Sequence, residues 1–154
     1  MGKETLDRSN IALVVFLLLQ TLNPALAQEA RPAVGDESIQ AVQKQFAEAY
    51  NRKDVDTMVA FFSENGVRIT PNGIFQGRDA IRRDMEKALA MGLHDYSVRR
   101  TISRTEGNLV FNGGEWQAKL GDQQFHGYYS ALLTHEGGKA QILEETVNIA
   151  SPGR

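Results

Sequence analysis

Apolar residues recur at helical spacing in the first half of the chain, and this pattern predicts three helices. Asp54 can cap the start of the second helix, and Gly92 can end the third. Residues 67–70 and 74–75 predict a short strand pair between the second and third helices. The apolar helix faces are formed by Ile39, Val42, Phe46, Ala49 and Tyr50 in the first helix, by Val55, Met58, Val59 and Phe62 in the second, and by Ile81, Met85, Ala88 and Leu89 in the third.

From Leu93 onward, apolar and polar residues alternate with a period of two, which is typical of strands. Glycine-containing sequences at 106–108, 112–114, 121–122 and 136–139 are interpreted as the turns between these strands. Helices followed by an antiparallel meander indicate an α+β domain.

The N-terminus has the features of an export signal. Lys3 and Arg8 precede an apolar run over 11–19, and Ala25 and Ala27 supply the small residues that signal peptidase needs. The run is shorter than the ~20 residues of a spanning helix, so we expect no stable membrane anchor. The prediction is a signal peptide over 1–27, a linker over 28–36, one domain over 37–150 and a tail over 151–154, with a periplasmic or secreted product.

Composition removes several function classes. The net charge of −2 is spread without a basic stripe, which argues against nucleic-acid binding. Because the chain has no cysteine, disulfides, thiolate metal sites and cysteine nucleophiles are excluded. Its three histidines show no repeated ligand spacing, and no nucleotide-binding fingerprint is present. We therefore expect no metal and no cofactor.

Three segments carry a family resemblance: Asn51-Arg-Lys-Asp-Val-Asp56, Phe61-Phe-Ser-Glu-Asn-Gly66 and Phe75-Gln-Gly-Arg-Asp-Ala-Ile81. They resemble the nuclear transport factor 2-like superfamily, which includes ketosteroid isomerases and polyketide cyclases, and the likeness extends over about 39–149. The resemblance implies a cone-shaped α+β fold, in which three N-terminal helices pack on a strongly curved, mainly antiparallel sheet around a pocket. It also implies a homodimer formed through the sheet.

Ketosteroid isomerases use an aspartate base, with a tyrosine and a protonated carboxylic acid as oxyanion donors. The resemblance puts Thr70 at the position of the base, Phe46 at that of the tyrosine and Ser130 at that of the acid. A threonine cannot exchange a proton near neutral pH, so isomerisation by this mechanism is disfavoured.

The pairing of the last two strands decides where Glu145 points. A four-residue turn over 135–138 would place Tyr128 opposite Glu145, whereas a five-residue turn would send Glu145 to the other face. The first register is preferred because it gathers Leu143 and Val147 on one apolar face with Glu145.

Glu145 would then be a buried carboxylate with Tyr128 or His126 as its hydrogen-bond partner, acting either as a general acid/base or as part of a structural pair. Burial would raise the pKa of Glu145, and an ion pair with Arg68 would reverse that shift. Arg68 shares a strand side with Thr70, so it can bind a ligand carboxylate, pair with Glu145 or lie at the rim. The predicted pocket lining is Phe46, Tyr50, Phe62, Arg68, Thr70, Ser130, Leu143 and Val147.

A further apolar set alternates along the strands that flank the turn at 121–122. We interpret it as an exposed patch that a second copy covers, and the alternative is that this set is the core and the strand phase is inverted. Its members are Trp116, Ala118, Phe125, Tyr129, Ala131 and Leu133.

Three functions are compatible with these residues. The leading one is an exported, dimeric domain that binds a small apolar or carboxylate-bearing molecule between its helices and sheet. The alternative is an enzyme of the polyketide cyclase or isomerase type that uses Glu145 with His126 or Tyr128. The third is an interaction module whose pocket is filled by its own side chains.

Overall fold

Two helices, a strand pair and a third helix precede four long strands in the part of the chain that the computed structural model describes, residues 34–136 and 139–150. The α+β prediction is confirmed. The elements are α2 (Val34–Asn51), α3 (Val55–Ala60), β1 (Phe62–Thr70), β2 (Gly73–Gln76), α4 (Arg78–Ala90), β3 (Leu93–Glu106), β4 (Leu109–Leu120), β5 (Gln123–Glu136) and β6 (Lys139–Val147).

The predicted signal peptide over 1–27 and the tail over 151–154 lie outside the described residues. Helix α2 already begins at Val34, so the last three residues of the predicted linker form its first turn. Within the described ranges, no helix is both long and apolar enough to cross a membrane.

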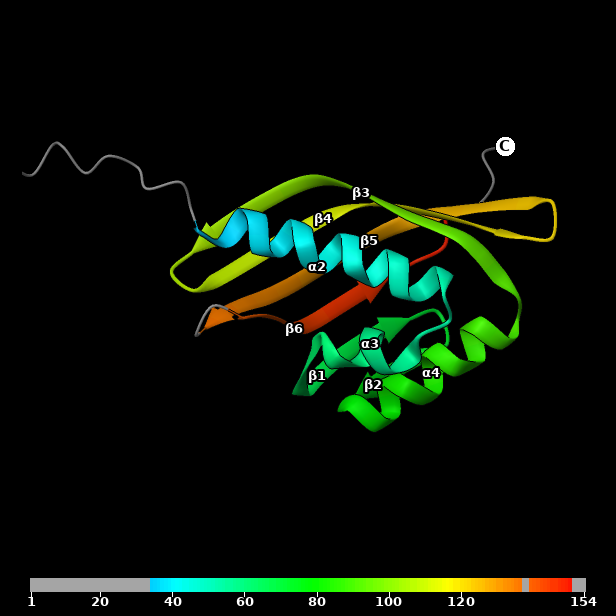
Figure 1. Ribbon diagram of the computed structural model, residues 1–154, viewed down its shortest axis with the longest axis horizontal. Coiled ribbons are helices and arrows are strands. Elements are labelled where there is room, and N and C mark those ends of the chain that lie inside the picture. The colour runs from blue at the N-terminus through cyan, green and yellow to red at the C-terminus, as the bar shows by residue number, and fades with distance from the viewer. Residues whose placement is uncertain (1–33, 137–138, 151–154) are drawn as a thin grey trace, which may run out of the picture. The chain divides into compact units, whose positions relative to one another are not determined.

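The strands form one mixed sheet in the order β2-β1-β6-β5-β4-β3. Neighbouring strands are antiparallel except β1 and β6, which run parallel. Helix α2 crosses one face of the long strands, while α3 and α4 lie beside β1 and β2 (Figure 1). The predicted arrangement of three helices on a mainly antiparallel sheet is therefore confirmed.

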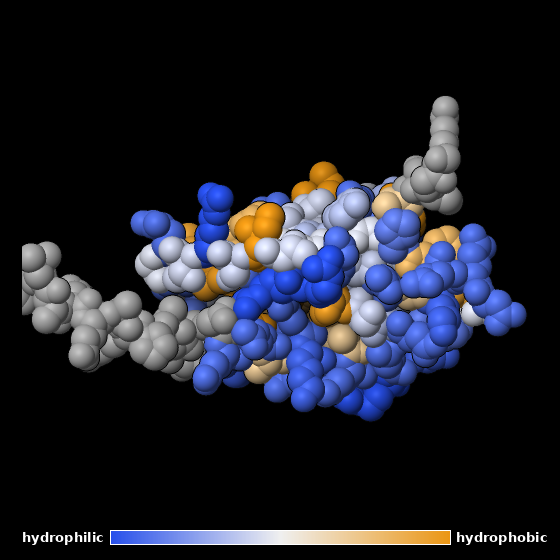
Figure 2. Space-filling model, turned by 90° about the horizontal axis from the view of Figure 1, so that it is seen from above, coloured by the Kyte–Doolittle hydropathy of each residue, from blue (hydrophilic) through white to orange (hydrophobic). Residues whose placement is uncertain are grey.

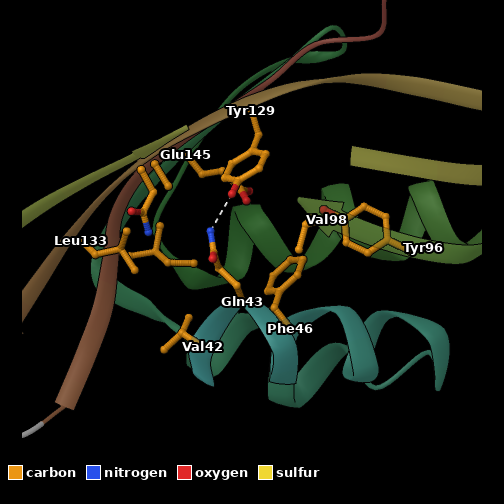
Figure 3. A pocket seen from close by; sticks show the side chains of 11 residues that line it. Val42, Gln43, Phe46, Tyr96, Val98, Tyr129, Leu133 and Glu145 are labelled. Atoms are coloured by element: carbon orange, nitrogen blue, oxygen red, sulfur yellow. Dashed lines mark hydrogen bonds between the residues drawn. The ribbon is translucent and has the colours of Figure 1, made fainter. Parts of the chain in front are cut away.

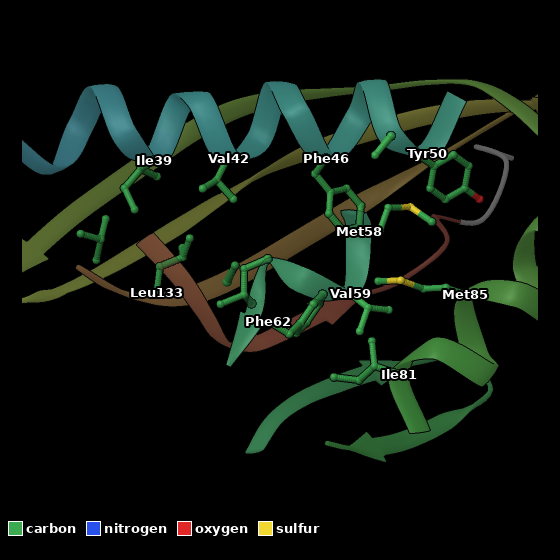
Figure 4. Packing of buried hydrophobic residues seen from close by; sticks show 14 of the residues in the cluster. Ile39, Val42, Phe46, Tyr50, Met58, Val59, Phe62, Ile81, Met85 and Leu133 are labelled. Carbon is green, nitrogen blue, oxygen red and sulfur yellow. The ribbon is translucent and has the colours of Figure 1, made fainter. Parts of the chain in front are cut away.

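The main core lies between the three helices and the inner face of the sheet, which is the face toward α2 (Figure 4). Most residues of the predicted apolar helix faces are buried there, because apolar side chains three and four positions apart share one side of a helix. Burying a large aliphatic or aromatic side chain stabilises the fold by about 1.5–3 kcal/mol. The apolar pattern of the helices thus explains where the sheet is covered.

Helix α3 begins where the sequence predicts. The Asp54 Oδ1 atom accepts a hydrogen bond of 3.0 Å from the backbone N–H of Thr57, and Oδ2 accepts one of 2.6 Å from the Thr57 hydroxyl. The end of the helix was predicted wrongly: Phe62 is the first residue of β1. Its fully buried side chain still packs in the core, and β1 begins only two residues after the last residue of α3.

The interpretation of 112–114 as a turn is wrong, because β4 runs without interruption through both glycines. Gly114 lies against β3, where the pairing shifts between Arg100 and Ile102. A Cβ atom at 114 would lie 2.2 Å from the backbone oxygen of Arg99. The glycine therefore permits a close approach of two strands, and Asn112 lies in mid-strand.

The predicted pairing of β5 and β6 is also wrong. Glu136 pairs with Lys139, and Ala131, instead of Tyr128, lies opposite Glu145. The register shifts between the Leu132 and Leu133 pairs, which leaves Leu143 as an extra residue in β6. Beyond such a bulge, the side chains of the bulged strand that would have faced one side of the sheet face the other.

The apolar set predicted as an exposed patch belongs to the inner face, so the alternative interpretation of an inverted phase is correct. Trp116, Ala118, Tyr129, Ala131 and Leu133 are all buried. Phe125 is half-buried and packs beside them. From above, the surface is largely hydrophilic, and apolar residues form separate patches on it (Figure 2).

Candidate functional site

Two hollows lie between the helices and the inner face of the sheet, and both have Phe46 and Tyr96 in their walls. The larger hollow has a volume of about 110 Å³ and opens beside α4 and the ends of β1 and β6. The smaller, of about 30 Å³, lies over β4, β5 and β6. An engineered apolar cavity of about 150 Å³ is known to hold benzene, so the two hollows together suit a molecule with few heavy atoms.

Tyr96 lines both hollows and lies at an irregularity in the pairing of β3 with β4. Asp95 has a φ angle of 54°, and the pairing with β4 shifts between His94 and Ser97. Asn51, at the end of α2, accepts a 2.7 Å hydrogen bond from the Tyr96 N–H and donates one of 2.8 Å to its carbonyl oxygen. The Asn51 amide thus bonds both backbone polar groups of Tyr96, as a neighbouring strand would, and links the end of α2 to β3.

An aromatic row lines the cavity around Tyr96. Its ring stacks on Tyr50 at a centroid distance of 4.4 Å and lies 6.4 Å from the ring of Trp116. Phe46 meets Tyr96 edge-on at 6.3 Å. Stacked and edge-to-face pairs at such distances stabilise by about 0.5–1.5 kcal/mol beyond their burial, so the rings support one another in this wall.

Trp116 lies across β5 because residue 127 is a glycine. A Cβ atom on Gly127 would lie 2.6 Å from the indole nitrogen of Trp116. The indole N–H donates a 2.8 Å hydrogen bond to the backbone oxygen of Asn148, beyond the end of β6. This bond satisfies the polar atom of the indole while its ring faces the larger hollow.

Three charged side chains meet at the boundary of the two hollows. Arg68 comes from β1, Asp84 from α4 and Glu145 from β6, which pairs with β1 so that Arg68 and Glu145 are neighbours. Arg68 Nε donates to Asp84 Oδ2 at 3.1 Å, and Arg68 Nη1 donates to Glu145 Oε2. The three side chains are only 11%, 4% and 9% exposed, so water screens them little.

One guanidinium is shared between two carboxylates. Burial raises the pKa of Glu145, the negative charge of Asp84 raises it further, and Arg68 opposes both. The expectation that an ion pair with Arg68 would reverse the shift in the pKa of Glu145 is therefore wrong, because burial, with Asp84 added, outweighs Arg68. Burial lowers the pKa of Arg68, but Glu145, Tyr96 and Asp84 outweigh it, so its net pKa is raised and it stays charged.

Sequence reasoning missed Asp84, although a signal was present. Asp84 follows Ile81 by three residues and precedes Ala88 by four, so it lies on the apolar face of α4. A carboxylate on the buried face of a helix requires a partner. That requirement could have suggested a pairing with Arg68, the basic residue predicted to point inward.

Besides Glu145, the smaller hollow is lined by a Gln43–Tyr129 pair and by Asn112. Gln43 Nε2 donates a 2.6 Å hydrogen bond to the Tyr129 hydroxyl (Figure 3). Asn112, from β4, is fully buried, and neither Nδ2 nor Oδ1 has a hydrogen-bond partner among the described residues. Leaving a buried polar group unpaired costs about 1–3 kcal/mol. Asn112 was missed because Asn-Gly-Gly resembles a turn sequence.

The structure brings together part of the predicted site. Phe46, Tyr50, Arg68, Thr70 and Val147 line the hollows. Phe62 belongs to the main core. Ser130 and Leu143 are absent from both linings. Ser130 faces the opposite side of β5, and Leu143 is the bulged residue of β6.

His126 and Tyr128 are not near Glu145. Both lie on the outer face of β5 and are exposed, Tyr128 to 54%. The alternation of side chains along β5 separates them from the inward-facing Tyr129 and Ala131. Within residues 34–136 and 139–150, no three histidine, aspartate or glutamate side chains gather as metal ligands.

The fold is that of the nuclear transport factor 2-like proteins. A protein with a cystatin-like fold from Nostoc punctiforme superposes with a TM-score of 0.69 and 14% identity, covering 77% of this chain and 92% of that one. A ketosteroid isomerase-like protein from Erwinia carotovora gives 0.66 and 17%, covering 75% and 96%. An NTF-2 like protein from Shewanella oneidensis gives 0.66 and 17%, covering 73% and 97%.

Residues 42–142 match the family of SnoaL-like domains, and the chain belongs to that family. Among curated proteins, none matches the chain. The matched range begins within α2 and ends in β6, and so contains nearly all the elements that enclose the two hollows.

Proposed function

We propose that this protein is an exported, dimeric domain that binds a small, largely apolar molecule in the two hollows. The observation that carries the proposal is the set Arg68, Asp84 and Glu145, buried at the edge of an aromatic-lined cavity. Apolar cavities with a few convergent polar groups are typical ligand sites. Because Arg68 already bonds two carboxylates, the set favours an uncharged ligand over the carboxylate-bearing one also expected from the sequence.

Filling the larger hollow tests this proposal. Ala88 lines that hollow, whereas Ala90, also on α4, is exposed. Native mass spectrometry of protein isolated from its own host should show a retained small molecule in the wild type and in Ala90→Phe, but not in Ala88→Phe. Equal retention by both variants would place the ligand elsewhere, and no retained molecule in any of them would contradict the binding function.

Export and assembly have separate tests. Export predicts that protein from the cell envelope begins at Gln28, and Edman sequencing that finds Met1 or Gly2 instead would contradict it. For assembly, the outer face of the sheet is covered by none of the helices among the described residues, and it exposes Ile102, Phe111 and Tyr128. Exposed apolar residues of this kind are typical of interfaces, so Phe111→Glu should yield monomers in sedimentation, and a monomeric wild type would contradict the dimer.

A second candidate is an enzyme of the polyketide cyclase or isomerase type. It is favoured by the raised pKa of Glu145 at the wall of the hollow, since catalytic acids and bases often have shifted pKa values. Glu145 would then act without His126 or Tyr128. The test is protein-dependent exchange of deuterium into cyclohex-2-enone, which Glu145→Gln should abolish if this candidate is right.

A further inference from the structure

Asn112, Ala131 and Glu145 form one row across the sheet. Asn112 pairs with Ala131 between β4 and β5, and Ala131 pairs with Glu145 between β5 and β6. Because neighbouring strands are ~4.8 Å apart, the backbones of Asn112 and Glu145 are separated by about 10 Å. All three residues line the smaller hollow. The alanine therefore leaves a space on the inner face, with a polar side chain on each side of it.

The polar groups around this space differ in whether they already have hydrogen-bond partners. The Tyr129 hydroxyl already accepts from Gln43, and Glu145 already accepts from Arg68. Asn112 lines the same hollow, and both its donor and its acceptor atoms are buried without a partner in the described chain. It lies 0% exposed, so bulk water does not reach it. Its amide therefore needs a group that enters the hollow.

We propose that the space over Ala131 is a subsite for a hydroxyl group, held between Asn112 and Glu145, on a ligand whose apolar part occupies the larger hollow. A hydroxyl both donates and accepts, so it can satisfy one of the unpaired Asn112 atoms and bond to Glu145 at the same time. A volume of about 30 Å³ suits one oxygen atom but no ring. The inference rests on the proposed binding function and names the ligand class.

Phenol and toluene test the subsite, because they match in shape and differ by a hydroxyl in place of a methyl group. Dissociation constants come from titrations followed by protein NMR. In the wild type, phenol should bind about fivefold or more tightly than toluene, the effect of one net hydrogen bond. Asn112→Leu should remove this preference while toluene binding persists. Ala131→Val, which keeps the amide but fills the space, should also remove it.

The outcomes separate the two proposals. Equal binding of phenol and toluene by the wild type would overturn the subsite while leaving the binding function intact. Retention of the phenol preference in Asn112→Leu would overturn it too. Saturable binding of neither compound would contradict the binding function itself, and the subsite with it.

Discussion

The inner face of the sheet buries polar groups at two places, and they differ in whether those groups are paired. At the β1–β6 end, Arg68 bonds both Asp84 and Glu145. Over β4, the Asn112 amide has no partner within the described residues. In a low-dielectric interior a satisfied polar network rigidifies the fold, whereas an unsatisfied group destabilises it. The difference indicates that the Arg68 set stabilises the cavity, whereas the Asn112 amide is available to bind a ligand.

The largest effect that tests this comparison is loss of Arg68. Arg68→Met keeps the length of the side chain but leaves two buried carboxylates without their cation. Breaking a buried ion pair by removing one partner costs about 3–5 kcal/mol. Chemical denaturation should show a loss of that size in the free energy of unfolding.

Arg82→Met is the matched control for this variant. Arg82 pairs with Asp56 at 2.7 Å, but the Asp56 side chain is 86% exposed. An exposed ion pair contributes about 0–1 kcal/mol, so the control should lose little stability. Similar losses in the two variants would show that the Arg68 set has no special role. Adding Glu145→Gln to Arg68→Met should restore part of the stability.

A smaller effect concerns pH. Because the pKa of Glu145 is raised in the folded protein, its contribution to stability is fully present below the unfolded value of ~4.3 and is lost as pH rises through the folded value. Glu145→Gln removes this dependence. The stability of the variant relative to the wild type should therefore improve between pH 4 and pH 7 in urea denaturation.

The neighbouring Glu144 is exposed and supplies the control. Glu144→Gln should stay at a constant offset from the wild type across the same pH range. If the stability of Glu145→Gln relative to the wild type instead fell as pH rose, the pKa of Glu145 would be lowered in the folded protein. The effect of Arg68 on that pKa would then exceed the effect of burial.

The helices and the fold class could be predicted from the sequence because apolar spacing reports directly which side of a helix is buried. The strand pairing could not. The extra residue at Leu143 changes which side chains face inward, and no local pattern marks it. Likewise Gly114 permits a close approach of β3, although a glycine pair in such a context more often marks a turn.

The candidate site was predictable only where one strand decides it. Arg68 and Thr70 share a side of β1, and both line the larger hollow. Of the partners considered for Glu145, Arg68 is the one found. Tyr128 and His126 were considered because the long-range pairing of β5 with β6 was predicted wrongly. To predict that Asn112 faces the site, one long strand would have had to be recognised in place of two short ones.

The smallest effect distinguishes a paired asparagine from an unpaired one. Asn112→Leu replaces an unsatisfied buried amide by an apolar group of similar shape, and such a change is neutral or stabilising when no partner is lost. We expect the ligand-free variant to range from equal to the wild type to about 1 kcal/mol more stable. Thermal and urea denaturation measure this directly.

Asn51→Leu is the matched control, because the Asn51 amide makes two hydrogen bonds to the backbone of Tyr96. Losing both should cost about 1–3 kcal/mol. The opposite result, a stable Asn51→Leu and an unstable Asn112→Leu, would mean that Asn112 is already satisfied in the empty protein by a bound water. A ligand hydroxyl would then have to displace that water, and would gain little by doing so.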